Sequence, residues 1–235
     1  MCGRFTLTSV PDPYAEIFKL PEIPKMPARY NIAPTQEVAA VRACIEDSTR
    51  EIVMLRWGLV PYWQKDPPSG TPMINARAET VTTKRSFSDG FARRRCLILA
   101  DGYYEWQQTG LGKQPWYIHM GDRRVFGMAG LFELWHGEDG TIIKSCVVLT
   151  TGANSLSRSI HDRMPVIIAA EDYDLWLDPT VIRASEIKPL LKAYPSSEMQ
   201  AERIGGFVNS VSNDGPECLE PFDSLPLFQD PPVDS

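Results

Sequence analysis

The run Cys96–Ala100 (Cys-Leu-Ile-Leu-Ala), followed at once by Asp101–Trp106 (Asp-Gly-Tyr-Tyr-Glu-Trp), decides how this chain folds. A short apolar run bounded by turn residues is typical of a buried strand, and an Asp-Gly pair is a strong turn signal. The aromatic residues that follow the turn surround Glu105. We therefore expect a buried strand that ends at a turn and leads into an aromatic segment carrying an acid.

Similar strand-like segments recur along the chain, rich in β-branched or aromatic residues and separated by Gly, Pro, Asp or Asn. They are Arg4–Thr8, Val38–Cys44, Ile52–Trp57, Trp116–His119, Val125–Leu131, Ile142–Thr150 and Val166–Ala169. The helical patterns are fewer and shorter: Pro13–Leu20 with Asp12 as candidate N-cap, Ser86–Arg95, Ser155–Ile160, Asp172–Leu177 and Ile182–Ala193. This order predicts an α+β fold with a curved or barrel-like, mostly antiparallel β-sheet and peripheral helices.

The 235 residues show no linker and no internal repeat, so we expect one domain over residues 1–221. Prolines alternate with acids over residues 222–235, which is typical of a loosely ordered acidic tail. No apolar run approaches the roughly 20 residues that a membrane span needs. No secretory signal is recognisable at the start of the sequence. We therefore expect a cytoplasmic protein without membrane association.

The cysteines are scattered and never spaced as Cys-x-x-Cys; they are Cys2, Cys44, Cys96, Cys146 and Cys218. Cys44, Cys96 and Cys146 lie in apolar runs and are expected to be small buried hydrophobic residues. With three histidines in the chain, no cluster resembles a zinc site. The sequence therefore predicts neither a metal centre nor a cofactor.

The formal net charge of −6 argues at first against a nucleic-acid partner. That charge is unevenly placed, because residues 210–235 contain six acids and no Lys or Arg, which leaves the rest of the chain neutral. Residues 74–96 hold six basic side chains against two acids, a local net charge of +4. The body of the protein can therefore present a basic face, although a solvated helix with an arginine run explains the same pattern.

Cys2 stands out chemically, because removal of Met1 would leave it as the N-terminus with an amine and a thiol on adjacent carbons. A free α-amine has a pKa of about 7.7–8.0, so roughly a tenth of it is neutral at pH 7, a few hundred times more than for a lysine. Such a group condenses with an aldehyde to an imine, which the thiol closes to a thiazolidine ring. Alternatively the thiolate alone attacks an acyl group, as in N-terminal-nucleophile hydrolases, or Cys2 is simply buried.

Three further residues can take part in chemistry, and each also has a plain structural explanation. Glu105 lies among aromatic rings, which disfavour its charged form and raise its pKa toward the range of proton transfer, unless it faces solvent. His161 can titrate near neutrality, although a single histidine often serves only as a hydrogen-bonding residue. Asn75 can orient a carbonyl group, or it can form a turn at a strand edge.

Six short motifs occur together in one order. They are Met1–Phe5 (MCGRF), Arg29–Pro34 (RYNIAP), Trp57–Pro61 (WGLVP), Asn75–Thr80 (NARAET), Asp101–Trp106 (DGYYEW) and His161–Pro165 (HDRMP). Through these motifs the sequence closely resembles the SOS-response-associated peptidase (SRAP) family, the abasic-site processing proteins, from residue 2 to about Pro221. An ordered match of six motifs is much more specific than any single one.

The resemblance implies a single SRAP domain whose groove binds single-stranded DNA. It implies that Cys2 becomes the N-terminus and traps the ring-opened sugar of an abasic site as a thiazolidine, by lyase-type Schiff-base chemistry. The catalytic positions that match the family are Cys2, Asn75, Glu105 and His161. The positions that match its DNA contacts are Arg4, Arg77, Arg85 and Arg163 for phosphates, Thr150 in the pocket, and Pro34 with Tyr62 and Trp63 as an apolar wedge.

Three function classes follow from these observations. The first is a DNA–protein crosslinker that shields abasic sites in single strands and at single-strand/double-strand junctions, acting as a monomer without a cofactor. The second is a thiol peptidase that uses Cys2, Glu105 and His161, with Met1 of its own chain as a substrate. The third is a non-covalent reader of modified bases. Only the first predicts an adduct with abasic DNA that survives denaturation.

Overall fold

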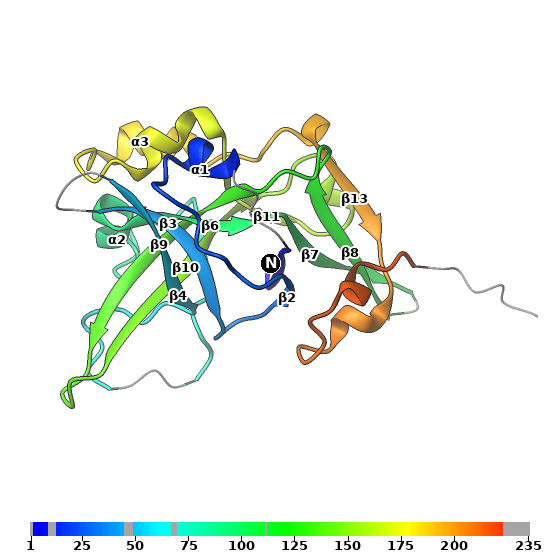
Figure 1. Cartoon of the computed structure of the whole chain (residues 1–235), viewed down its shortest axis with the longest axis horizontal. Helices are drawn as coiled ribbons and strands as arrows, with labels where there is room; N and C mark the ends of the chain where they lie inside the picture. Colours follow the sequence, from blue (N-terminus) through cyan, green and yellow to red (C-terminus); the bar gives the residue numbers. More distant parts are fainter. Residues whose placement is uncertain (1, 9–12, 45–48, 67–69, 111, 223–235) are drawn as a thin grey trace, which may run out of the picture.

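The computed structural model describes residues 2–8, 13–44, 49–66, 70–110 and 112–222. Five strands form a closed barrel in the order β10–β4–β3–β6–β9, and β9 pairs back with β10 (Figure 1). Their bounds are β3 Glu37–Ala43, β4 Arg50–Trp57, β6 Arg95–Ala100, β9 Phe126–His136 and β10 Ile142–Gly152. Neighbouring strands run antiparallel except β4 and β10, which are parallel. The expected α+β fold with a barrel-like, mostly antiparallel sheet is therefore confirmed.

A second, five-stranded sheet lies beside the barrel in the order β13–β8–β7–β1–β2, with every pair antiparallel. Its strands are β1 Arg4–Leu7, β2 Arg29–Ile32, β7 Gly102–Thr109, β8 Gly112–Met120 and β13 Met199–Arg203. The Phe5 ring of β1 packs edge-on against Trp57 of β4, with ring centroids 5.1 Å apart, and both side chains are fully buried. The core therefore extends from the barrel interior into the space between the two sheets.

The chain crosses from the barrel to the second sheet at Asp101 and Gly102, the turn that ends the apolar strand β6. The Asp101 carboxylate accepts hydrogen bonds from the backbone N–H of Thr8 at 2.6 Å and from the hydroxyl groups of Thr6 and Thr8. A Cβ atom on Gly102 would lie 2.2 Å from the Tyr117 ring, so only glycine fits there. The Asp-Gly pair thus fixes the corner that joins the two sheets.

Short elements complete the fold around these sheets. They are strands β5 Asn75–Arg77, β11 Arg163–Pro165 and β12 Ile167–Ile168; helices α1 Pro13–Phe18, α2 Ser88–Arg93, α3 Tyr173–Leu177 and α4 Ala184–Ile187; and 3-10 turns η1 Ser157–Ser159, η2 Ala170–Asp172, η3 Lys188–Leu190, η4 Ser196–Glu198, η5 Gly206–Asn209 and η6 Pro216–Leu219. The helices lie at the periphery, as expected, with α1 and α3 at one end of the barrel (Figure 1).

Several local predictions were wrong in extent. Strands β2, β5, β7, β11 and β13 were not predicted, because three of them are very short and the other two carry many polar residues. The helix expected over Ser86–Arg95 is only α2, since Arg95 already belongs to β6, and Ile182–Ala193 holds α4 followed by a 3-10 turn that contains Pro189. Ser155–Ile160 forms only η1.

Two cysteine predictions hold and one fails. Cys96 and Cys146 are fully buried, whereas Cys44 is half-buried and lies just beyond the end of β3. The candidate N-cap Asp12 and residues 223–235 of the expected tail lie outside the described residues. The domain boundary at residue 221 stays a prediction.

Candidate active site

Cys2 is fully buried just before β1, the strand at which the second sheet receives the start of the chain. Its carbonyl oxygen accepts a hydrogen bond of 2.8 Å from Nδ2 of Asn75, the first residue of β5. The other amide atom, Asn75 Oδ1, is buried and has no hydrogen-bond partner among the residues that the structure describes. Asn75 thus anchors Cys2 from one side and keeps an acceptor available beside it.

Glu105 lies on β7 of the second sheet and is only 3% exposed. Burial raises the pKa of its carboxyl above the usual range, and the nearby His161 ring opposes that shift. Burial also raises the pKa of the Cys2 thiol, and the negative charge of Glu105 adds to this effect. Glu105 and His161 line the same cleft, and burial disfavours the charged forms of both the Cys2 thiol and the Glu105 carboxyl.

His161 sits in the turn between η1 and β11, with its side chain 28% exposed. The Arg163 backbone N–H donates to its Nδ1 atom at 3.0 Å, which requires an unprotonated Nδ1 and places the ring proton on Nε2. The Asp162 carboxylate also lies 2.9 Å from Nδ1, and that contact would require the opposite protonation. The backbone N–H of Arg163 cannot lose its proton and Asp162 is largely exposed, so we assign Nδ1 as the acceptor of the backbone hydrogen bond.

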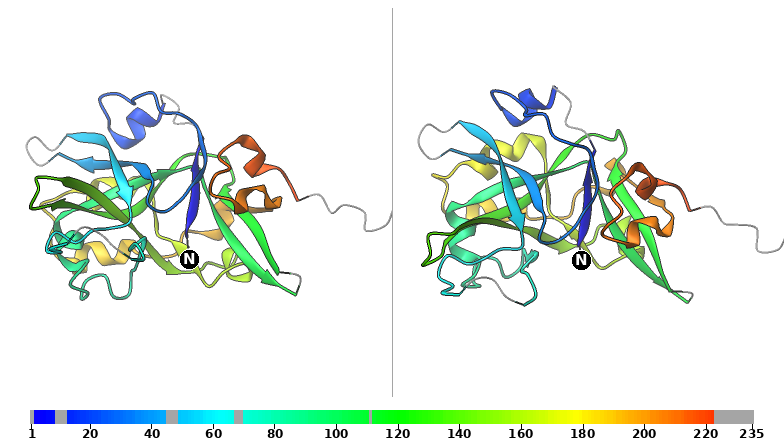
Figure 2. Two further views of the ribbon diagram at one scale, coloured as in Figure 1. Left: turned by 90° about the horizontal axis from the view of Figure 1, so that it is seen from below. Right: turned by 60° about the horizontal axis from the view of Figure 1, so that its bottom comes forward.

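A cleft of about 400 Å³ opens beside these residues, lined by Gly3, Arg4, Glu105, Trp106, Lys113, His161 and Asn209. One wall comes from the C-terminal segment, residues 206–222, which runs alongside β1 in both views of Figure 2. The Trp106 indole donates to Asn209 Oδ1 at 2.8 Å, which joins this segment to β7. The cleft is therefore assembled from the start, the middle and the end of the chain.

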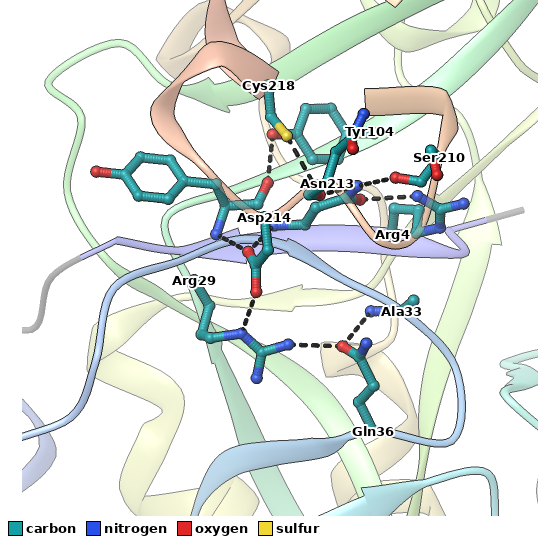
Figure 3. A network of polar contacts seen from close by, with 11 residues as sticks. Arg4, Arg29, Ala33, Gln36, Tyr104, Ser210, Asn213, Asp214 and Cys218 are labelled. Carbon is teal, nitrogen blue, oxygen red and sulfur yellow. Dashed lines mark hydrogen bonds and ion pairs between the residues drawn. The ribbon is translucent and has the colours of Figure 1, made fainter. Parts of the chain in front are cut away.

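A polar network holds the C-terminal segment in place (Figure 3). Asp214 accepts from the backbone N–H groups of Tyr30 and Asn31 at 2.6 and 2.8 Å, and from Arg29 Nε at 2.5 Å. Asn31 Nδ2 in turn donates to three carbonyl oxygens of the segment, with the shortest bond of 2.7 Å to Asn213. The open edge of β2 is thus occupied by residues of this segment.

Arg4, expected to bind phosphate, is largely engaged within the protein. Its Nη1 donates to Asn31 Oδ1 at 2.8 Å and to the Val208 carbonyl oxygen at 3.0 Å, and its Nη2 donates to the Asn209 carbonyl oxygen at 3.3 Å. The guanidinium also lies 5.7 Å from the centre of the Trp106 ring. Arg4 lines the cleft, but most of its donors stabilise the cleft wall.

The barrel side of the site lies at the end of β10, where this strand exchanges its hydrogen-bonded partner strands. At its C-terminal end β10 pairs with β5 and β11 in place of β4 and β9, which brings Thr150 opposite both Arg77 and Pro165. The Arg163 guanidinium binds both carboxylate oxygens of Glu79, at 2.6 and 3.0 Å, and the Thr150 carbonyl oxygen at 2.6 Å. Thr150 itself is fully buried, whereas Arg77 is exposed and points away from the buried Ala76.

The expected wedge residues lie on the surface, each aromatic ring beside an arginine. The Arg85 guanidinium lies 4.5 Å from the centre of the Trp63 ring, and Arg94 lies 5.8 Å from that of Tyr62. Tyr62 is 56% and Trp63 39% exposed, which leaves both rings accessible. Pro34 is half-buried in the turn between β2 and β3.

The basic face expected over residues 74–96 is smaller than the charge count indicates. Arg95 is buried and donates to five backbone carbonyl oxygens, including that of Trp176 at 2.7 Å. Arg94 pairs with Asp89 at 2.5 Å and Glu133 at 2.7 Å. Two of the six basic side chains therefore serve the fold.

Within the part of the chain that the structure describes, no three His, Cys, Asp or Glu side chains are grouped as a metal site. None of the described helices is long and apolar enough to span a membrane.

A sequence profile for the family described as SOS response associated peptidase (SRAP) matches residues 1–211. The chain belongs to the SRAP family. It is 40% identical over 226 residues to the abasic site processing protein YoqW of Bacillus subtilis (strain 168). The aligned region covers 94% of this chain and 99% of YoqW. The chain is 34% identical over 202 residues to the abasic site processing protein HMCES of Gallus gallus, which covers 75% of this chain and 60% of HMCES.

Solved structures share the fold of this SRAP chain. A protein from Bacteroides thetaiotaomicron matches with a TM-score of 0.80 at 24% identity, covering 94% of this chain and 99% of that one. A phage-related protein from Bordetella bronchiseptica matches with a TM-score of 0.70 at 27% identity, covering 86% of this chain and 94% of that one. The barrel with its second sheet is therefore a fold found in other proteins.

Some residues of this SRAP site were not predicted from the sequence. Trp106, Lys113 and Asn209 line the cleft, and Glu79 binds Arg163. Trp106 and Glu79 belong to motifs that were recognised, so their position beside matched residues was an available signal. Lys113 and Asn209 lie outside those motifs, and only the three-dimensional structure brings them to the site.

Proposed function

We propose that this protein recognises abasic sites in single-stranded DNA and captures them covalently through Cys2 as a thiazolidine. The observation that carries the proposal is the arrangement around Cys2: its carbonyl is held by Asn75, and the buried acid Glu105 and His161 lie beside it at the cleft. The names of YoqW and HMCES describe abasic-site processing in those proteins, which supports the same substrate here.

The chemistry begins with removal of Met1, which makes the Cys2 nitrogen a free amine. An abasic sugar opens to an aldehyde, and the amine condenses with it to an imine with loss of one water molecule. The thiol then adds across the C=N bond: sulfur bonds to carbon and the thiol proton passes to nitrogen. The product is a five-membered ring joined to the DNA, and no oxidant, metal or cofactor enters the balance.

The surrounding groups suit the proton transfers of this sequence. Glu105, with its raised pKa, can donate a proton to the departing oxygen during imine formation and recover it afterwards. His161, whose Nδ1 accepts from the Arg163 backbone, can help to open the sugar ring through its Nε2 atom. Asn75 Oδ1, buried and without a described partner, can accept a hydrogen bond from a sugar hydroxyl or from the terminal amine.

The raised thiol pKa favours an order in which the amine reacts first. A thiolate is the attacking form of cysteine in acyl transfer, and reactive cysteines are usually found where that form is stabilised. At Cys2 burial and the charge of Glu105 act in the opposite direction. A neutral thiol can still add to an imine, so the crosslinking reaction is favoured over a thiol peptidase.

The DNA is held through its backbone and by stacking. Exposed Arg77 and Arg85 bind phosphates without reading the bases. Trp63 and Pro34 form the apolar wedge that stacks on a base or on the end of a duplex at a junction. Arg4 and Arg163 contribute mainly by building the walls of the site, since protein groups occupy most of their donors. Buried Thr150 supports Arg163.

The test is incubation with a single-stranded oligonucleotide that carries one abasic site, followed by denaturing electrophoresis. We expect a slow band with the natural abasic site. An intact strand and a strand whose abasic aldehyde has been reduced to an alcohol serve as controls and should give none. Mass spectrometry of the adduct should show loss of Met1 and of one water molecule. If the wild type binds the abasic strand but leaves no stable band, the covalent function is wrong.

A further inference from the structure

Lys113 is a cation of the cleft that none of the sequence motifs includes. It lines the same cleft as Glu105 and His161, near the end of the β7–β8 hairpin. Lys113 is exposed, and its side-chain ammonium forms no hydrogen bond or ion pair with any residue that the structure describes. The other cation of the lining is Arg4, whose donors are directed at Asn31, Val208 and Asn209. Of these two cations, Lys113 is the one left available to an anion.

The hairpin that carries Lys113 is held on both sides. Lys113 pairs with Gln108 in the antiparallel register of β7 and β8. Gln107, next to Gln108 on β7, donates through Nε2 to the Ser159 carbonyl oxygen at 2.8 Å. Its Oε1 accepts a hydrogen bond of 3.1 Å from the Trp116 indole. Trp106 is bound to Asn209 from the other side. The lysine therefore projects from a fixed backbone position at the cleft.

The charges at the site come from two different sheets. Arg77 belongs to β5, which is attached to the barrel strand β10, whereas Lys113 belongs to β8 of the second sheet. Cys2 lies between these sheets, anchored by Asn75 from the barrel side and next to Glu105 on the other. A strand that presents its abasic sugar to Cys2 must continue in both directions, and the phosphates on its two sides are then exposed to different cations.

We infer that Lys113 binds the DNA phosphate on the side of the abasic nucleotide opposite to the phosphate that Arg77 binds. The two cations clamp the backbone on either side of the reacting sugar, one from each sheet. This arrangement gives the cleft a preference for an internal abasic site over one at the end of a strand. The inference rests on the proposed function for the identity of the sugar, but binding of the backbone does not require the covalent step.

The experiment measures the salt dependence of binding to a single strand with a reduced abasic site, which cannot form an imine. Each phosphate contact contributes about −0.7 to the slope of log affinity against log salt. We expect Lys113→Ala to make the slope shallower by about 0.7 and Lys113→Arg to keep it. Lys144→Ala is the matched control: it removes an exposed lysine at the start of β10 that does not line the cleft, and should leave the slope unchanged.

A second arm locates the contact. Two shortened strands are used, one ending at the abasic nucleotide on its 5′ side and one on its 3′ side, without terminal phosphate. The loss of affinity caused by Lys113→Ala should disappear with one of them and persist with the other, and Arg77→Ala should show the reverse pattern. An unchanged slope for Lys113→Ala, or a loss that persists with both shortened strands, would overturn the assignment.

The phosphate contact of Lys113 and the covalent function can fail independently of each other. If the wild type fails to crosslink natural abasic DNA but Lys113→Ala still lowers the slope, the covalent function is wrong and the phosphate contact stands. If the wild type crosslinks and the slope does not depend on Lys113, the contact is wrong and the covalent function stands.

Discussion

Replacing Asn75 by Ala tests how strongly the anchor on Cys2 controls the reaction. The hydrogen bond from Asn75 Nδ2 to the Cys2 carbonyl oxygen is 2.8 Å long, and Cys2 is fully buried. A buried carbonyl that loses its donor costs about 1–3 kcal/mol, because no solvent replaces the lost partner. The penalty raises the free energy of the arrangement in which Cys2 is held beside Glu105. It does not affect conformations in which water can bind the Cys2 carbonyl.

The size of the effect follows from that cost. A penalty of about 1–3 kcal/mol lowers the population of the anchored arrangement by roughly 5- to 140-fold, at about 1.4 kcal/mol per factor of ten. The rate of crosslinking should fall by the same factor, since only the anchored amine and thiol meet the sugar. Affinity for an undamaged single strand should stay close to that of the wild type, because Asn75 is not among the phosphate contacts.

The assay is single-turnover crosslinking with excess protein, quenched at intervals and resolved on a denaturing gel. Asn75→Asp is the informative companion, because it keeps the size of the side chain but replaces the donor by an acceptor. Its rate should fall at least as far as that of Asn75→Ala. If both variants stay within about twofold of the wild-type rate, the hydrogen bond does not position Cys2, and the reasoning fails.

Four further predictions concern other parts of the site. Cys2→Ala, with Met1 removed, should lose the stable adduct, still be trapped by borohydride as the reduced imine, and nick abasic DNA more than the wild type; absence of both trapping and nicking would exclude the amine. Arg77→Ala should reduce the salt slope of single-strand binding by about 0.7, and an unchanged slope would remove it from the contacts. Because the pKa of Glu105 is higher in the folded than in the unfolded protein, protonation of this carboxyl stabilises the folded state. That stabilisation is complete below the unfolded pKa of about 4.3 and is lost as the pH rises through the folded pKa. Glu105→Gln, which cannot ionise, should therefore be more stable than the wild type toward urea at about pH 8 but not at about pH 4, and should crosslink more slowly by roughly 10²–10⁴-fold. Asp214→Ala removes three hydrogen bonds to β2 and should lower the unfolding free energy by about 1.5–3 kcal/mol in urea titrations, with weaker single-strand binding as the cleft wall loosens; equal stability would show that the segment is held by its apolar contacts.

Features that depend on neighbouring residues could be predicted from the sequence. The Asp101-Gly102 corner was visible as a turn after an apolar run, and the structure adds the reason: the Tyr117 ring leaves no space for a Cβ atom. The same stretch left open whether Glu105 is a buried acid or faces solvent, and its burial with a raised pKa agrees with the first alternative. Local sequence carries such information because the groups concerned are bonded to one another or lie on adjacent strands.

Features that depend on distant partners could not be predicted. Arg93, Arg94 and Arg95 are consecutive and chemically identical, yet Arg93 is exposed, Arg94 is paired with acids, and Arg95 is buried against carbonyl groups. Arg93 ends α2, Arg94 follows it and Arg95 begins β6, so their difference arises from what the rest of the chain places beside each one. Strand β5 was missed for a similar reason, since three residues carry no periodicity and the strand exists only through its pairing with β10.

The contact between Arg4 and the carbonyl groups of Val208 and Asn209 joins residues that are 204 and 205 positions apart. During synthesis on the ribosome the first strand therefore emerges long before the residues that complete its surroundings. The growing chain can form the barrel, but it cannot close the wall beside Cys2 until almost all of its length has been made. A nascent or prematurely terminated chain thus carries Cys2 without a finished pocket, and the DNA capture proposed above would be the last property that the molecule acquires.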